Sequence, residues 1–219
     1  MLNNYSENNI VKIGGTIASE LQISHEVYGE KFYIFDISVS RLSGADDKIP
    51  VIVSERLIDL ATFKPGLLIE IEGQFRSYNK YREEKSKLVL SIFIKELRTI
   101  EVEEEAKTKN EALLNGFVCK KPVYRKTPLG REIADVLIAV NRAYNKSDYI
   151  PCIMWGRNAK FCENLPVGTN IKIEGRVQSR EYEKKYEDGT VVKNLAYEVS
   201  VSKLELLDKE EKEEQAEQE

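Results

Sequence analysis

The chain has 219 residues and a mass of 25.1 kDa, which fits one large domain or two small ones. Hydrophobic residues make up 42% of it and charged residues 32%, and no apolar run approaches the ~18 residues that a transmembrane helix needs. The polar N-terminus lacks the basic-then-apolar order of a secretory signal. We therefore expect a cytoplasmic protein with no membrane partner.

The net charge of −4 is distributed unevenly. Residues 110–207 carry 16 basic and 12 acidic side chains, which leaves this region at +4. The segment 208–219, with sequence DKEEKEEQAEQE, has a net charge of −5, and its composition predicts an acidic disordered tail. The acidity of the whole chain thus hides a basic second half.

Signals for catalysis or metal binding are weak in this sequence. The cysteines Cys119, Cys152 and Cys162 form no CxxC pair, and His25 is the single histidine. No Walker loop, GxGxxG, HExxH or GxSxG motif is present. We therefore predict a protein that is not an enzyme, with no catalytic residues, no cofactor and no metal.

The chain contains an internal repeat, which is the first feature to search for. IPVIVSER (49–56) resembles IPCIMWGR (150–157) at an offset of 101, and IEIEG (69–73) matches IKIEG (171–175) at an offset of 102. Further matches at an offset of 101 are Gly15 with Gly116, Gly29 with Gly130, Ile37 with Ile138, Val39 with Val140, and Arg41 with Arg142. We predict a first domain at 1–100, a charged linker at 101–110, a second domain at 111–207 and the tail at 208–219.

Each copy is predicted to be mostly strand, because apolar residues alternate with a period of two. Residues 33–39 and 134–140 show this alternation, and both precede the IPVIV or IPCIM strand. A helix-like stretch follows (SERLIDLATF or GRNAKFCENL), then a turn and two more strands. Five strands with a short helix between the third and the fourth is the order of the OB fold, a five-stranded Greek-key barrel that binds oligonucleotides or oligosaccharides. The predicted fold class is all-β, with two tandem OB-fold domains.

Aromatic and basic side chains are interleaved in the second copy. Tyr149 and Trp155 are six residues apart on one predicted strand, so they should share a face opposite Ile150, Cys152 and Met154. Aromatic rings beside cations suit a single nucleic-acid strand, because bases stack on the rings and phosphates follow the cations. The candidate residues are Tyr144, Tyr149, Trp155, Tyr182, Arg142, Lys146, Arg157, Arg176, Arg180, Lys184 and Lys185.

Structural roles remain open for several of these residues. One tryptophan and some tyrosines are common as core or edge residues in β-domains. Arg142 and Arg157 are equally compatible with solvated surface charges.

Residues 115–182 resemble the bacterial single-stranded DNA-binding protein family. The resemblance is carried by Thr127, Pro128 and Gly130 (TP-x-G), by AVNR (139–142), by YIPCIMWGR (149–157) and by VGTNIKIEGRVQSREY (167–182). It implies that Tyr144, Tyr149, Trp155 and Tyr182 stack on single-stranded DNA, largely without sequence preference, in replication, recombination or repair. It also implies a homodimer that joins four OB folds. The tail ends in AEQE without the apolar tip often found in that family, so the recruitment of replication or repair proteins stays open.

The first copy resembles the family more weakly, through IPVIVSERL (49–57) and IEIEGQFRSY (69–78). Lys48 and Ser54 stand at the positions equivalent to Tyr149 and Trp155, so the stacking platform is missing. Weaker candidates in this copy are Arg41, Arg56, Arg76, Tyr78, Tyr81 and Arg82. Its loss of rings keeps two alternatives open: a protein-interaction adaptor, such as a primosome-like component, and a single-stranded RNA-binding protein.

Overall fold

The computed structural model describes residues 7–41, 43–82, 85–102, 106, 109–185 and 189–207. The side chains of the candidates Tyr81, Arg82, Lys184 and Lys185 lie outside the described residues. So do the predicted acidic tail at 208–219 and part of the predicted linker at 101–110. The described chain is built mainly of β-strands, which confirms the all-β prediction.

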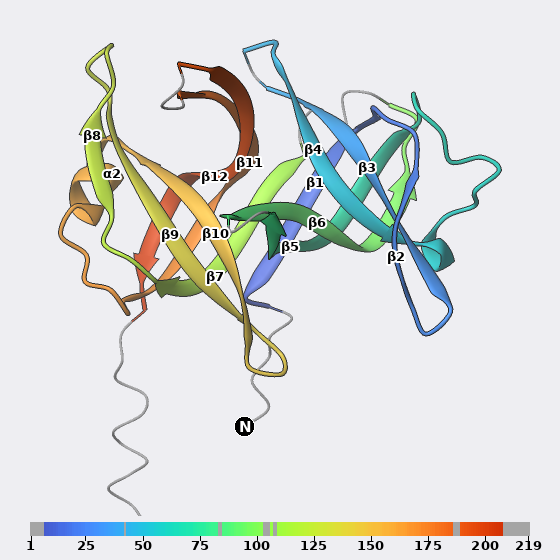
Figure 1. Cartoon of the computed structure of the whole chain (residues 1–219), viewed down its shortest axis with the longest axis horizontal. Helices are drawn as coiled ribbons and strands as arrows, with labels where there is room; N and C mark the ends of the chain where they lie inside the picture. Colours follow the sequence, from blue (N-terminus) through green and yellow to red (C-terminus); the bar gives the residue numbers. More distant parts are fainter. Residues whose placement is uncertain are drawn as a thin grey trace, which may run out of the picture.

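The two halves of the chain contain the same elements in the same order (Figure 1). The first half contains β1 (Asn9–Ile17), β2 (Gln22–Val27), β3 (Glu30–Ser40), β4 (Asp46–Ser54), the 3-10 helix η1 (Glu55–Leu57), β5 (Leu68–Arg82) and β6 (Lys85–Thr99). The second half contains β7 (Asn110–Val118), β8 (Val123–Lys126), β9 (Glu132–Arg142), β10 (Lys146–Trp155), α2 (Gly156–Cys162), β11 (Asn170–Lys185) and β12 (Val191–Leu206).

In each half, five strands close into a barrel. In the first half β1 pairs with β3 and β5, β3 pairs with β4, β4 runs parallel to β6, and β6 pairs with β5. The second half repeats this circuit through β7, β9, β10, β12 and β11. The predicted five-stranded barrels are therefore present twice. The alternation in β3 and β9 fills the barrel interiors, as Phe35, Ile37 and Val39 and their counterparts Val136, Ile138 and Val140 are all buried.

The structure differs from the prediction in two details. A further short strand, β2 or β8, lies on the outer edge of each barrel, paired with β3 or β9. The predicted helix after the third barrel strand is a full helix in the second half but a single 3-10 turn in the first. There, Ile58 is already extended, and the Asp59 side chain accepts a hydrogen bond from the backbone N–H of Ala61 at 3.0 Å, which favours a turn over further helix.

Gly15 and Gly116, which the repeat matches, sit where the first strand of each barrel crosses a neighbour closely. A Cβ atom on Gly15 would lie 2.2 Å from the carbonyl oxygen of Ser38. A Cβ atom on Gly116 would lie 2.6 Å from the carbonyl oxygen of Ala139. Both distances are far below van der Waals contact, so each strand can pair with two neighbours because glycine stands at the crossing.

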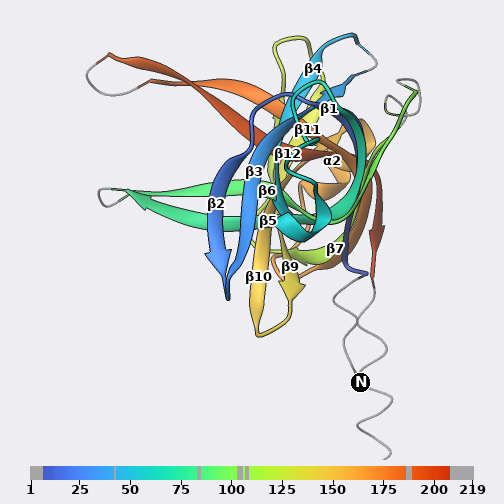
Figure 2. The same ribbon diagram turned by 90° about the vertical axis from the view of Figure 1, so that its right-hand side faces the viewer.

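The two barrels join edge to edge. β1 pairs with β7 in antiparallel register, from Asn9 opposite Leu114 to Ile13 opposite Asn110, and this creates one continuous twelve-stranded sheet within the described residues. Figure 1 shows the two barrels side by side, with the second half on the left. In Figure 2 the β5–β6 and β11–β12 hairpins project to the same side of the molecule.

Two buried carboxylates reinforce this joint, one from each half. In the first carboxylate anchor, Asp47 accepts hydrogen bonds from the N–H and the hydroxyl of Ser179, both at 2.7 Å, and from Arg41 Nε at 2.7 Å. Arg41 also donates to the Ser179 carbonyl oxygen. Asp47 is fully buried. The first-domain aspartate is thus bound to the second domain.

The second carboxylate anchor is its counterpart by the repeat. Asp148 is 1% exposed and accepts from the N–H of Ser77 at 2.8 Å and from Arg76 Nη1 at 2.9 Å. The hydroxyl oxygen of Ser77 in turn accepts a hydrogen bond from the backbone N–H of Tyr149 at 2.7 Å. Each domain thus supplies one buried aspartate that accepts hydrogen bonds from the other domain.

We expect Asp47→Asn to lower the free energy of unfolding by about 2–3 kcal/mol at pH 7, because it removes a charged acceptor from Arg41 and Ser179. Burial alone would raise the pKa of Asp47, but the hydrogen bonds from Arg41 and Ser179 outweigh burial and lower it. The stabilisation is therefore fully present above about pH 4, the ordinary pKa of an aspartate in the unfolded chain. It is lost as the pH falls through the lower pKa that Asp47 has in the folded state.

Urea unfolding at a series of pH values from 7 to 2 measures this effect. The gap between the parent and Asp47→Asn should narrow as the pH falls. Asp46→Asn, at the exposed neighbouring residue, is the control and should change little. A gap of constant size across the whole range would contradict the predicted linkage.

Candidate nucleic-acid interface

The two rings on β10 lie outside the barrel. Tyr149 is 42% exposed and Trp155 37% exposed, while Ile150, Cys152 and Met154 are buried. The predicted alternation along this strand is therefore observed. Because the barrel core holds the alternate residues, the two rings stand on a fixed strand and face solvent.

The other two predicted rings come from neighbouring elements. Tyr144 sits in the turn between β9 and β10 and is 94% exposed. It and Asn145 both have positive φ values, 62° and 53°, in the three-residue loop that joins the paired residues Arg142 and Lys146. Tyr182 lies on β11 and is 38% exposed. All four predicted rings are thus accessible to a ligand.

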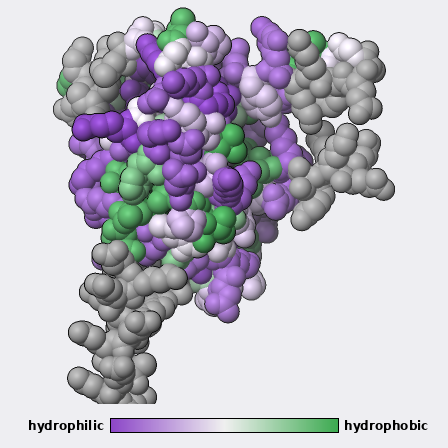
Figure 3. All heavy atoms as spheres, turned by 90° about the vertical axis from the view of Figure 1, so that its left-hand side faces the viewer, coloured by the Kyte–Doolittle hydropathy of each residue, from purple (hydrophilic) through white to green (hydrophobic). Residues whose placement is uncertain are grey.

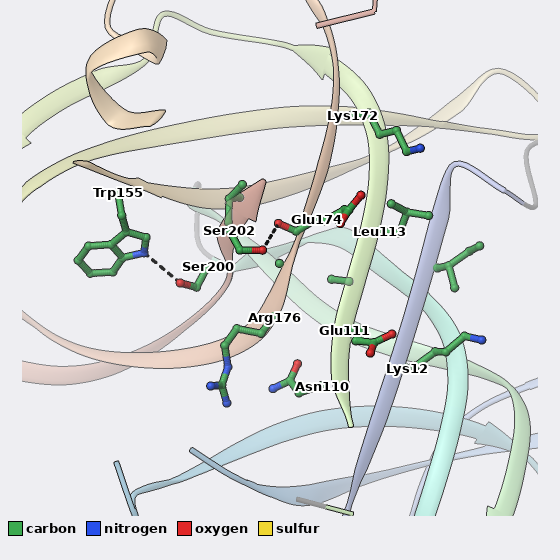
Figure 4. Close-up of a pocket in the computed structure, with 14 residues that line it drawn as sticks. Lys12, Asn110, Glu111, Leu113, Trp155, Lys172, Glu174, Arg176, Ser200 and Ser202 are labelled. Atoms are coloured by element: carbon green, nitrogen blue, oxygen red, sulfur yellow. Dashed lines mark hydrogen bonds between the residues drawn. The ribbon is translucent and has the colours of Figure 1, made fainter. Parts of the chain in front are cut away.

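The rings divide between two hollows. Tyr149 and Tyr182 line a groove of about 1520 Å³ between the second domain and the β5–β6 hairpin, which we call the interdomain groove. Trp155 lines a separate pocket of about 910 Å³ together with Arg176 and Ser200 (Figure 4). The indole Nε1 of Trp155 donates to Ser200 Oγ at 3.0 Å, which fixes the plane of the ring.

Many of the predicted arginines are held in ion pairs. Arg180 lies 3.3 Å from Glu198, Arg142 lies 3.6 Å from Asp148, and Arg56 lies 3.0 Å from Glu30. Arg41 and Arg76 belong to the carboxylate anchors. A guanidinium that already serves a buried carboxylate has fewer donors left for a phosphate. This applies to Arg41, Arg76, Arg142 and Arg180, whose partners Asp47, Asp148 and Glu198 are buried, whereas the exposed Arg56 pairs with the half-buried Glu30.

Other predicted cations are unpaired. Lys146 and Arg157 are exposed, Arg176 is half-buried beside Trp155, and none of the three forms an ion pair with the described residues. Tyr78 of the first domain is 51% exposed. At the position equivalent to Trp155, Ser54 is 8% exposed and hydrogen-bonds Glu30. The first domain has no exposed ring at that position.

The sequence analysis missed several residues of the interdomain groove. Lys80 and Lys87 of the first domain and Lys120 of the second line it. So does Tyr197, whose pKa is raised by burial and by the carboxylate of Asp36. One signal was available for Lys80, which stands 102 residues before Tyr182, the offset at which this part of the repeat aligns.

The far end of the second domain offers a different surface. Figure 3 shows this face, on which hydrophobic residues form patches separated by hydrophilic ones. Exposed apolar residues of this domain include Val123, Leu129, Phe161 and Val167. Such dispersed apolar exposure is common on globular proteins and needs no functional explanation.

The cysteines are poor nucleophiles in this structure. Burial raises the pKa of Cys162 to about 11 and that of Cys152 well above its ordinary value. His25 is exposed on β2 of the other domain, with its ring stacked 4.8 Å from that of Phe32. Among the described residues, no group of three or more His, Cys, Asp and Glu side chains is placed to hold a metal ion. In the same part of the chain, no helix is long and apolar enough to cross a membrane.

The comparisons with known proteins identify relatives of the second domain. Residues 109–207 match the model of the "Single-strand binding protein family". "Single-stranded DNA-binding protein 2" of Listeria innocua is 35% identical over 81 residues, which cover 34% of this chain and 51% of the relative. A "Single-stranded DNA-binding protein" of Clostridium tetani is 36% identical over 88 residues, which cover 37% and 59%. The chain spans about half the length of the curated relatives it matches.

Solved structures resemble both domains together. The wild-type single-stranded DNA-binding protein from Thermus aquaticus superposes with a TM-score of 0.67 at 19% identity, covering 92% of this chain and 93% of that one. At this level of identity the likeness concerns the fold, which is the tandem arrangement of OB barrels.

Proposed function

We propose that the chain binds single-stranded DNA largely without sequence preference, because residues 109–207 match the single-strand binding protein family. The observation that carries the proposal is the exposure of Tyr149, Trp155 and Tyr182 on one barrel, on the strands β10 and β11 that both pair with β12. Nucleic-acid bases stack on such rings at about 1–3 kcal/mol each. Because every base has a π-face, stacking does not depend on the sequence of the strand.

The phosphates require cations beside these rings. Lys146 and Arg157 flank the two ends of β10, and Arg176 lies beside Trp155 in the same pocket. We assign the phosphate contacts of the second domain to these three side chains because their charges are not neutralised by ion pairs within the described residues. Binding through them releases counterions, so affinity should fall as salt rises.

The biological setting follows from the ligand. Single strands arise when duplex DNA is opened for replication, recombination and repair, so we propose that the chain acts in these processes. We also propose that it acts in the cytoplasm. Replication or repair proteins are candidate partners.

The assembly that we propose is a homodimer with four OB barrels. β1 and β7 already pair with each other inside one chain, so a second copy would associate through other surfaces. Four barrels would present several contacts to one strand, and each contact after the first would be intramolecular.

We expect sedimentation equilibrium to give a mass of about 50 kDa, twice the 25.1 kDa of one chain. The measurement should use the full chain without DNA over a tenfold range of concentration. A mass of about 25 kDa throughout that range would refute the homodimer while leaving strand binding untouched.

Trp155 is the single tryptophan of the chain and reports directly on binding. We expect its fluorescence to be quenched on titration with oligo(dT), because a stacked base contacts the indole. Trp155→Ala and Tyr149→Ala should each weaken binding by about 1–3 kcal/mol, measured with a labelled oligonucleotide. Lys48→Ala, at the first-domain position equivalent to Tyr149, should cost much less.

Two results would count against this proposal. Unchanged tryptophan fluorescence with no retention of the oligonucleotide would remove the proposed function. Equal losses in Lys48→Ala and Trp155→Ala would show that the two domains contribute alike. Competition between matched DNA and RNA strands would show which nucleic acid the site prefers.

The second carboxylate anchor generates a separate prediction. Ser77→Ala removes the acceptor of the Tyr149 backbone N–H, so it should weaken oligo(dT) binding by about 0.5–1.5 kcal/mol. Ser179→Ala is the matched control, because Ser179 contacts Asp47, which precedes Lys48 rather than a ring. Thermal melts should confirm that both variants are folded.

A double variant separates positioning from general damage. If Ser77 acts by holding Tyr149, then Ser77→Ala should have little further effect on binding once Tyr149 is alanine. An undiminished loss in the Tyr149→Ala background would show that Ser77 does not act through this ring.

A further inference from the structure

Two lysines of the first domain are placed at a cost to stability. Lys80 on β5 and Lys87 on β6 are direct partners in the register of the hairpin. Like charges opposite each other on neighbouring strands are destabilising. Neither lysine forms an ion pair within the described part of the chain. An anion bound between the two ammonium groups would relieve this repulsion.

Both lysines line the same groove as two rings of the second domain. They line the interdomain groove, whose other wall carries Tyr149 and Tyr182. The hairpin that carries them projects to the same side of the molecule as the β11–β12 hairpin (Figure 2). A strand stacked on the two tyrosines would therefore run past the two lysines.

The acidic residues of this groove are already neutralised. Asp135 accepts from Arg125 at 2.9 Å. Glu198 is 3% exposed, accepts from Gln178 at 2.8 Å and pairs with Arg180 at 3.3 Å. Among the described residues that line the groove, the unpaired charges are thus the ammonium groups of Lys80, Lys87 and Lys120. This balance favours an anionic ligand.

The repeat shows what replaced the rings in the first domain. Lys80 stands at the position equivalent to Tyr182, and Lys48 at the position equivalent to Tyr149. A lysine offers a mobile point charge with three donors and no aromatic face. At these two positions the second domain carries rings, which can bind bases, and the first domain carries ammonium groups, which can bind phosphates.

We propose that Lys80 and Lys87 of the first domain form a phosphate-binding site for the same DNA strand whose bases stack on Tyr149 and Tyr182. The proposal rests on the function given above and assigns a distinct role to each domain. The second domain binds bases and backbone. The first domain contacts the backbone alone at this groove.

The test is the salt dependence of oligo(dT) binding by the full chain. Lys80→Ala combined with Lys87→Ala should reduce the steepness of the plot of log affinity against log salt by about 1.4, since each phosphate contact on a single strand contributes about 0.7. At 50 mM salt the affinity should fall roughly 10–100-fold. The quenching of Trp155 at saturation should be unchanged, because the stacking site is intact.

The matched control is Lys31→Ala combined with Lys64→Ala, which removes the same charge from exposed sites of the first domain away from the groove. It should leave the salt dependence nearly unaltered. Equal changes in the two double variants would mean that net charge acts at a distance, and would overturn the proposed site. Binding with an unaltered slope in the Lys80/Lys87 variant would overturn it as well.

A charge reversal distinguishes binding from folding. Lys80→Glu places a carboxylate opposite Lys87, so it should stabilise the hairpin while weakening DNA binding more than Lys80→Ala does. A Lys80→Glu variant that binds as well as the parent would refute the site. If the unaltered chain fails to bind any oligonucleotide, the proposed function falls, and this site falls with it.

Discussion

The antiparallel pairing of β1 with β7 is the constraint on which the rest of the structure depends. It joins two barrels that each have a complete core, and it places β5–β6 of the first barrel against the ring-bearing face of the second. The buried carboxylates Asp47 and Asp148 make the joint specific, because each accepts hydrogen bonds from the opposite domain. A sliding of β1 along β7 would remove the hydrogen bonds that Asp47 accepts from Ser179 and those that Asp148 accepts from Ser77 and Arg76, and the loss of such bonds at a buried carboxylate is costly.

Much of the fold could be predicted from the sequence. The repeat and the alternation in residues 33–39 and 134–140 predicted two barrels, since a period of two dictates which side chains enter a core. The added strands β2 and β8 were not predicted. Every residue of β2 is exposed, so no apolar alternation marks this strand. The helix of the first domain was overestimated because Asp59 diverts the backbone into a turn.

The candidate interface was predicted in part, and the gaps have a physical cause. The exposure of Tyr149 and Trp155 followed from strand alternation, which is local. The ion pairs of Arg76 and Arg180 with Asp148 and Glu198 join residues far apart in sequence, so composition alone could not separate structural arginines from free ones. The lysines opposite Tyr149 come from the other domain. They could be recognised only once the packing of the two barrels was known.

Covalent fusion of the two barrels has a consequence for how a strand is oriented. Two identical subunits related by a two-fold axis offer the same surface twice, so their combined binding surface has no polarity. Here equivalent positions carry a phenol at Tyr182 and an ammonium at Lys80, so the two ends of the binding surface differ chemically. A DNA strand also has unlike ends. On the proposed function, one 5′-to-3′ sense should therefore fit this molecule better than the reverse, and each chain would impose that polarity on a bound strand.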